Sequence, residues 1–225
     1  MKLNKLALLM GLGLSVLSTT PFAEQANNAQ AVFNDAYQNY LNAVKTKENV
    51  QQAAEQAYTL GKAVYGENAD NTANLAINYA KSINRYGKQW IEKRFSLYQQ
   101  AYTILATNHG KQSPETIDAL VGMASFAPSA QKADYYLEQV IAIANTQNNP
   151  KFVADMKLEA ATILANKFSY EKYREAKNYL EEADEYYLAN LPKNSVEQIK
   201  ADFLMASFAE GRKRYDQAIE RLNRV

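Results

Sequence analysis

Apolar residues recur along the chain at spacings of three and four, with polar residues between them. Three windows show this most clearly: Phe33, Ala36, Tyr37 and Tyr40; Leu97, Ala101 and Ile104; and Leu137, Val140, Ile141 and Ala144. Such spacing places one apolar stripe along an α-helix. No sustained alternation of apolar and polar residues, which is typical of strands, occurs between Ala29 and Val225. The pattern therefore predicts an all-α protein.

Proline and glycine divide this helical pattern into segments. Four prolines sit at its breaks: Pro114, Pro128, Pro150 and Pro192. Ser113 and Asn149 each place a side-chain acceptor directly before a proline, which is typical of a helix start. Gly66 and Gly110 follow apolar stretches, where glycine readily ends a helix. We expect about ten antiparallel helices joined by short loops.

The sequence also repeats itself. Residues 113–127 (SPETIDALVGMASFA) recur as residues 195–209 (SVEQIKADFLMASFA), with nine of fifteen positions identical at an offset of 82. The pair Tyr65-Gly66 recurs as His109-Gly110 at an offset of 44. A repeated period of this size indicates a solenoid of stacked helix pairs. Five pairs account for the chain, at about residues 29–65, 70–109, 113–146, 150–190 and 195–225.

The second helices of the last two pairs carry the pattern Tyr-x-x-Ala-x-x-x-Leu-x-x-Ala. It is formed by Tyr173, Ala176, Leu180 and Ala183, and by Tyr215, Ala218, Leu222 and Val225; Met205-Ala206 and Ala209 precede the second set. This pattern resembles the tetratricopeptide repeat (TPR), in the longer form found in kinesin-light-chain-like arrays. The resemblance implies a right-handed superhelix whose first helices line a concave groove that holds segments of other proteins. The alternative is a plain helical bundle with coincidental spacing.

Alignment of the first helices places one set of polar residues toward the expected groove. The set comprises Asn34, Gln38, Asn74, Lys81, Arg85, Asp118, Ser125, Lys200 and Ser207. Amides such as Asn74 can bond a peptide backbone, and cations such as Lys81 and Arg85 can meet a carboxylate. The fuller Lys/Asn/Arg set of carboxylate-clamping family members is absent here. Each position could equally be an ordinary solvated residue.

The first residues resemble a secretory leader. Lys2 and Lys5 precede an uncharged apolar run from Leu6 to Leu17, and small residues lead to Ala23. About twelve apolar residues are too few to span a bilayer. We expect a signal peptide over residues 1–23, cleavage after Ala23, and a TPR-like domain over residues 24–225 without stable membrane insertion. The leader looks bacterial, which favours the periplasm of a Gram-negative bacterium; a retained amphipathic anchor is the alternative.

Composition narrows the possible chemistry. The chain has 25 Lys and Arg against 24 Asp and Glu, a formal charge of +1, so bulk charge does not favour nucleic acid as a partner. Without cysteine there is no thiolate nucleophile and no disulfide, and the single histidine removes most metal sites. The sequence contains no glycine-rich phosphate loop and no G-x-S-x-G or H-E-x-x-H motif. We therefore expect no enzyme, no cofactor and no metal.

Several other features are interpreted as structural. Most of the sixteen tyrosines, Tyr79 and Tyr215 among them, fall at packing positions, and Trp90 is expected to be a wedge between helices. His109 is expected to cap the carbonyls at a helix end. The acidic run at residues 181–185 is interpreted as a solvated face. The last helix should leave part of its apolar stripe uncovered.

Three functional hypotheses follow. The first is a non-enzymatic periplasmic adaptor that binds a protein or peptide partner in the groove and could act within an envelope complex. The second is a repeat module or accessory subunit of a TonB-type energy-transducing uptake system, which secreted repeat regions of this kind resemble. The third is a small-ligand carrier or an enzyme, which would need an apolar pocket with converging polar groups.

Overall fold

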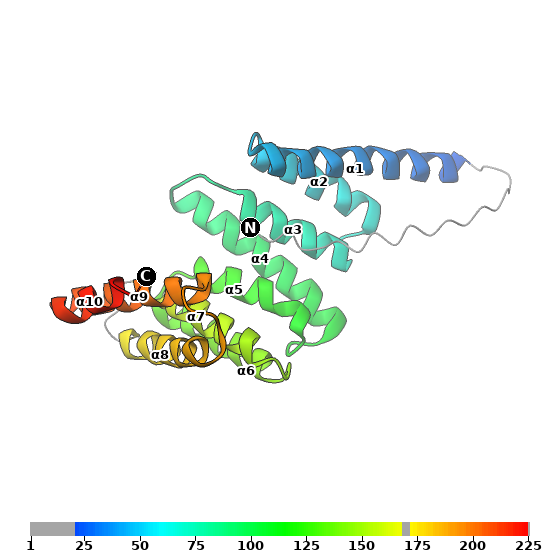
Figure 1. Cartoon of the computed structure of the whole chain (residues 1–225). Coiled ribbons are helices and arrows are strands. Elements are labelled where there is room, and N and C mark those ends of the chain that lie inside the picture. Colours follow the sequence, from blue (N-terminus) through cyan, green and yellow to red (C-terminus); the bar gives the residue numbers. More distant parts are fainter. Residues whose placement is uncertain (1–20, 168–171, 225) are drawn as a thin grey trace. The chain divides into compact units, whose positions relative to one another are not determined.

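The computed structural model describes residues 21–167 and 172–224. All regular structure in these two ranges is helical, as predicted (Figure 1). The helices are α1 (Pro21–Thr46), α2 (Val50–Tyr65), α3 (Asp70–Ser82), α4 (Lys88–His109), the 3-10 helix η1 (Pro114–Thr116), α5 (Ile117–Ser125), α6 (Ala130–Asn145), α7 (Pro150–Asn166), α8 (Tyr173–Asn190), α9 (Val196–Gly211) and α10 (Tyr215–Leu222). The signal-peptide prediction falls largely on residues 1–20, outside the described residues.

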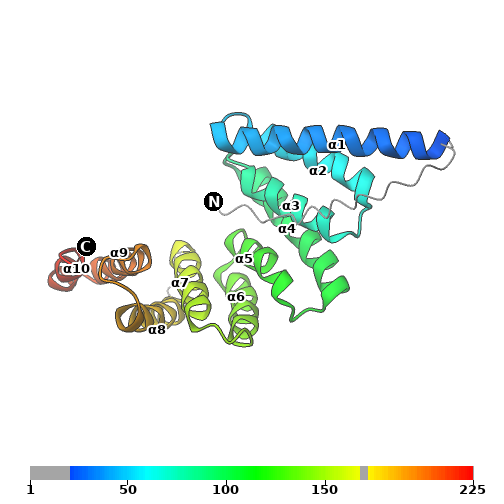
Figure 2. The same ribbon diagram turned by 45° about the vertical axis from the view of Figure 1, so that its right-hand side comes forward.

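The helices pack in consecutive pairs: α1 with α2, α3 with α4, α5 with α6, α7 with α8, and α9 with α10. Figure 2 shows the two helices of each pair lying side by side. The chain divides into two compact units, of which the first ends at Lys111 and the second begins at Gln112. Helices α1 to α4 therefore belong to unit 1, and helices α5 to α10 belong to unit 2. This arrangement is an all-α helical repeat.

The core of unit 1 depends on a glycine in the C-terminal half of α2. Gly61 is buried between Phe33 of α1 and Leu75 of α3, which are 0% and 1% exposed. A Cβ atom at Gly61 would lie 3.2 Å from Cε2 of Phe33 and would overlap Cδ1 of Leu75. The missing side chain thus lets α2 approach both neighbours, as small residues do between closely packed helices.

Repeated residues in unit 1 occupy equivalent positions at the helix ends. Gly66 and Gly110 follow α2 and α4 with φ angles of 87° and 95°, a region that favours glycine. His109 does not cap carbonyls as predicted; its Nε2 lies 2.5 Å from Oδ2 of Asp70 at the start of α3. Asn108 donates to Oδ1 of the same carboxylate at 2.8 Å. Burial raises the pKa of Asp70, but the hydrogen bonds from Asn108 and His109 outweigh it, so the pKa lies below its ordinary value.

The sequence repeat in unit 2 marks equivalent core positions. Ala119 and Ala201 are both fully buried, and Met123 and Met205 are 3% and 8% exposed. The two first helices differ in length, because α5 begins only after the η1 turn and ends before Pro128. Helix α5 has 9 residues, whereas α9 has 16. The repeat therefore preserves packing positions rather than helix length.

The last helix pair leaves an apolar surface uncovered. Tyr215, Ile219 and Leu222 of α10 are 57%, 55% and 46% exposed, whereas Ala218 is buried against α9. The expected uncovered stripe is therefore present among the described residues. The prediction that Tyr215 belongs to the core is wrong, because its side chain lines an open groove between α9 and α10 instead of being buried.

The acidic run in α8 is not simply a solvated face. Asp184 is 4% exposed, and its Oδ2 accepts a hydrogen bond of 2.6 Å from Nη1 of Arg221 in α10. The same Nη1 lies 3.1 Å from Oδ1 of Asp202 in α9, which is also 4% exposed. Three helices thus meet at one arginine. The interpretation failed for Asp184 because its partner lies 37 residues away.

Candidate functional site

The predicted groove residues of unit 1 lie on α1, on α3 and in the loop after α3. Asn34 and Gln38 are exposed on α1, and Asn34 accepts a hydrogen bond from Gln30 within the same helix. Asn74 and Lys81 are half-buried on α3. Helices α1 and α3 both pack against α2, which lies between them in the chain. The structure therefore places these residues on two helices that share α2 as a neighbour.

Arg85 lies outside the helix on which the alignment placed it. Helix α3 ends at Ser82, and Arg85 belongs to the loop that leads to α4. Its guanidinium carbon lies 4.8 Å from the ring centroid of Trp90, a cation–π contact, and its carbonyl accepts a 3.0 Å hydrogen bond from Arg94. Half-buried Trp90 therefore provides a platform for this arginine, and its role as a wedge between helices stays a prediction.

The predicted residues of unit 2 lie on helices that adjoin. Helices α5, α7 and α9 contact one another in turn. Asp118 and Ser125 lie half-buried on α5, and Lys200 and Ser207 are exposed on α9. Residues seven apart on a helix share one side, so each pair points in one direction. These first helices therefore provide a candidate surface.

Helix α7 adds charged residues that sequence analysis missed. Lys151 Nζ lies 2.9 Å from Oδ2 of Asp155 on α7 and 2.8 Å from Oε1 of Glu197 on α9. Tyr187 of α8, which is fully buried, donates from its hydroxyl to Oδ1 of Asp155 at 3.1 Å. The spacing of four between Lys151 and Asp155 was the available signal, but it is shared by many solvated helices. We call Lys151, Asp155, Glu197, Lys200 and Ser207 the α7–α9 face.

The charges of this face are fixed by their neighbours. Hydrogen bonds to Glu197 and Asp155 raise the pKa of Lys151, and the hydrogen bond from Lys151 lowers the pKa of Glu197. Burial and the charge of Asp155 raise the pKa of Tyr187 far above its ordinary range. Lys151 therefore stays protonated, Glu197 stays ionised and Tyr187 stays neutral across physiological pH. Donors and acceptors held in this way are suited to binding a partner.

Three observations on the described residues concern metal binding, the single histidine and membrane-spanning helices. Within residues 21–167 and 172–224, no group of three or more His, Asp or Glu side chains could hold a metal ion. The only histidine, His109, is paired with Asp70 rather than with a nucleophile. Among the described helices, none combines the length and apolar character needed to cross a membrane.

Comparison with known proteins supports the fold. No protein-family model matches the sequence, and no curated protein matches it either. A crystal structure of nearly identical TPR-like repeats from Podosopora anserina, described as kinesin light chain, superposes with a TM-score of 0.63 at 14% identity. A single-substitution variant of that protein gives a TM-score of 0.65 at 15% identity; each match covers 88% of this chain and 93% of the other. The chain therefore has the fold of TPR-like helical repeats.

Proposed function

We propose that this protein is a non-enzymatic scaffold that binds a segment of a protein partner on the α7–α9 face. TPR-like repeats generally mediate interactions between proteins. The observation that carries the proposal is the ion pair between Lys151 and Glu197, which joins neighbouring first helices and holds their polar side chains in place. A preordered surface loses less side-chain entropy when a partner binds.

The α7–α9 face offers chemistry that suits a peptide backbone. Ser207 can donate and accept hydrogen bonds, and the Lys200 ammonium can meet a carbonyl or a carboxylate. Both side chains are exposed, and they lie seven residues apart on α9. A bound segment that follows α9 would therefore meet both. Lys151 and Glu197, already paired, would border the contact.

The periplasm of a Gram-negative bacterium is our proposed location, because of the leader-like residues 1–23. In that compartment the partner would be another envelope protein. A role as a repeat module or accessory subunit of a TonB-type uptake system is a narrower form of the same proposal. Fractionation by spheroplast release and N-terminal sequencing tests the location: a released protein beginning at residue 24 supports it, and an intact cytoplasmic protein contradicts it.

A charge reversal tests the binding face. Lys200→Glu reverses an exposed charge on α9, and Lys193→Glu makes the same change in the loop between α8 and α9. Tagged wild type and both variants are crosslinked in cells, and the neighbours retained above a tag-only control are quantified by mass spectrometry. Lys200→Glu should lose neighbours that Lys193→Glu retains. Identical neighbours in both variants, or none above the control in wild type, would contradict the proposal.

A further inference from the structure

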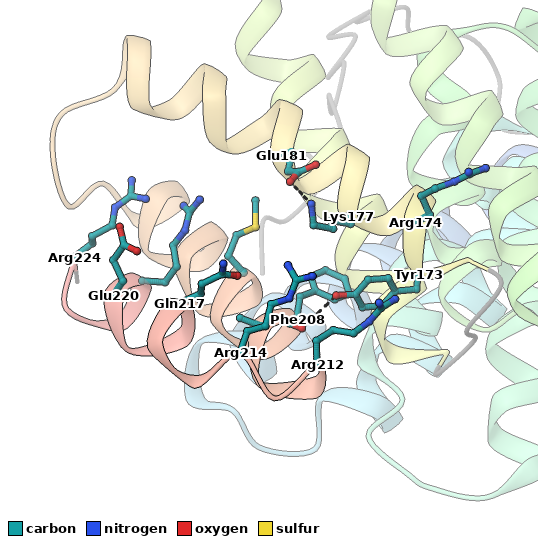
Figure 3. A pocket seen from close by; sticks show the side chains of 13 residues that line it. Tyr173, Arg174, Lys177, Glu181, Phe208, Arg212, Arg214, Gln217, Glu220 and Arg224 are labelled. Atoms are coloured by element: carbon teal, nitrogen blue, oxygen red, sulfur yellow. Dashed lines mark hydrogen bonds and ion pairs between the residues drawn. The ribbon is translucent and has the colours of Figure 1, made fainter.

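A second surface of unit 2 lies between α8 and α10, with α9 at its base. It is an open groove of about 980 Å³ (Figure 3). Arg174, Lys177 and Glu181 come from the α8 side, and Gln217 and Glu220 come from α10. The groove is distinct from the α7–α9 face, since it is bordered by second helices. It is also rich in cations, comprising Arg174, Lys177, Arg212, Arg214, Arg221 and Arg224.

Some of these cations are neutralised within the protein. Arg221 is paired with the buried carboxylates of Asp184 and Asp202, and Arg224 lies 3.4 Å from Asp202. Lys177 is paired with Glu181 of the same helix. By contrast, Arg174 and Arg214 are exposed and form no ion pair with any described residue. Among the described residues these two guanidinium groups therefore have no ion-pair partner; Arg174 belongs to α8, and Arg214 directly precedes α10.

The base and one wall of the groove are apolar and rigidly held. Met205 and Phe208 of α9 lie at the base. The Tyr173 hydroxyl donates to the Phe208 carbonyl at 3.2 Å, and the two rings meet edge to face with centroids 4.8 Å apart. The guanidinium of Arg212 lies over the Tyr173 ring, 4.4 Å from its centroid. The rings of Tyr173 and Phe208 are thus held against each other before any ligand arrives.

We propose that this groove binds an acidic peptide segment of a protein partner. Carboxylates of the segment would pair with Arg174 and Arg214, since guanidinium groups bind carboxylates through two parallel hydrogen bonds. An apolar side chain between those carboxylates would cover Met205 and Phe208. The 8 residues of α10 extend about 12 Å, enough to lie beside about four extended residues. The segment therefore needs only a short acidic core.

The groove fits a peptide better than it fits a nucleic acid. Base stacking needs an open aromatic face, and Arg212 already lies over the face of Tyr173. Gln217 can donate to and accept from a peptide backbone. The polar, apolar and cationic side chains of the groove therefore suit a peptide in which carboxylates alternate with apolar side chains.

The test uses the full chain, purified, and a fluorescein-labelled peptide of sequence GSEELEES, with binding followed by fluorescence anisotropy. The double variant Arg174→Glu, Arg214→Glu should bind the peptide at least about ten-fold more weakly than wild type. The matched control Lys45→Glu, Lys193→Glu reverses two exposed charges outside the groove and should stay within about two-fold. Helicity by circular dichroism should be the same in all three proteins.

Three further measurements decide the outcome. A peptide with glutamine at every glutamate should lose binding, and raising the salt concentration from about 0.05 to 0.5 M should weaken the binding of the acidic peptide. Equal affinity for both peptides, or no difference between the two double variants, would overturn the proposal. A single-stranded oligonucleotide of the same charge that binds as tightly as the peptide would overturn it as well. The result is independent of the α7–α9 face, because none of these changes alters that face.

Discussion

Replacing Arg221 by methionine tests the junction of α8, α9 and α10. Methionine keeps much of the apolar stem of the arginine and removes its charge. The change leaves Asp184 and Asp202, each 4% exposed, without their shared cation. Oδ1 of Asp184 has no hydrogen-bond partner among the described residues even in wild type. The variant therefore leaves buried negative charge uncompensated.

The expected cost follows from this geometry. Removing one member of a buried ion pair costs about 3–5 kcal/mol. The Arg221 side chain is 27% exposed, and Arg224 remains 3.4 Å from Asp202, so we expect a smaller loss of about 2–4 kcal/mol. Such a loss corresponds to an increase of roughly 30- to 1000-fold in the opening of α10. Because Ala218 is the one buried residue of this helix, α10 should detach before the rest of unit 2 unfolds.

Hydrogen–deuterium exchange measures this directly. Amides from Ala218 to Leu222 should lose most of their protection in Arg221→Met, while those of α5 and α6 should keep theirs. Adding Asp184→Asn and Asp202→Asn to the variant should restore part of the protection, since no unpaired charge remains. Arg174→Met, at an exposed residue without an ion pair in the described structure, is the control. Unchanged exchange of α10 in Arg221→Met would refute the proposed role of the arginine.

Three further changes test other parts of the structure. Gly61→Ala should destabilise unit 1 by about 1–3 kcal/mol in urea unfolding, because the new Cβ overlaps Leu75; an unchanged midpoint would contradict the close approach of α2. Asp70→Asn should be less stable than wild type above about pH 5. That difference in stability should disappear as the pH falls through the lowered pKa of Asp70, below 3.8. A difference that does not vary with pH would show that the charge of Asp70 beside His109 does not stabilise the fold. Ala218→Glu should bury a charge against α9 and cost more than about 2 kcal/mol, and unchanged thermal unfolding would argue against that packing.

The helical pairs could be predicted from sequence because their determinants are local or repeated. Asn149 accepts from the backbone N–H of Phe152 and caps α7 as expected. Gly66 and Gly110 end helices with positive φ, and the repeated Met123 and Met205 are both in the core. Each of these features depends on a few neighbouring residues or on the sequence repeat at an offset of 82 residues. Long-range packing then selects which predicted helices adjoin.

The surface residues were harder to predict because their roles depend on distant partners. Arg85 was assigned to a first helix, but α3 ends at Ser82 and the arginine stacks on Trp90 instead. Asp184 lies in an acidic run that resembles a solvated face, and only the fold brings Arg221 to it. The pairing of Lys151 with Glu197 spans 46 residues. No local pattern carries that information.

The most direct test of the proposed scaffold is a site-specific photo-crosslinking scan in cells. A photoreactive phenylalanine derivative is introduced at Lys200 or Ser207 on the α7–α9 face, and at exposed Glu138 on α6 as the control. We predict that Lys200 and Ser207 yield the same crosslinked partner and that Glu138 does not yield it. A partner crosslinked from Glu138 but from neither α9 position would contradict the assignment of the binding face.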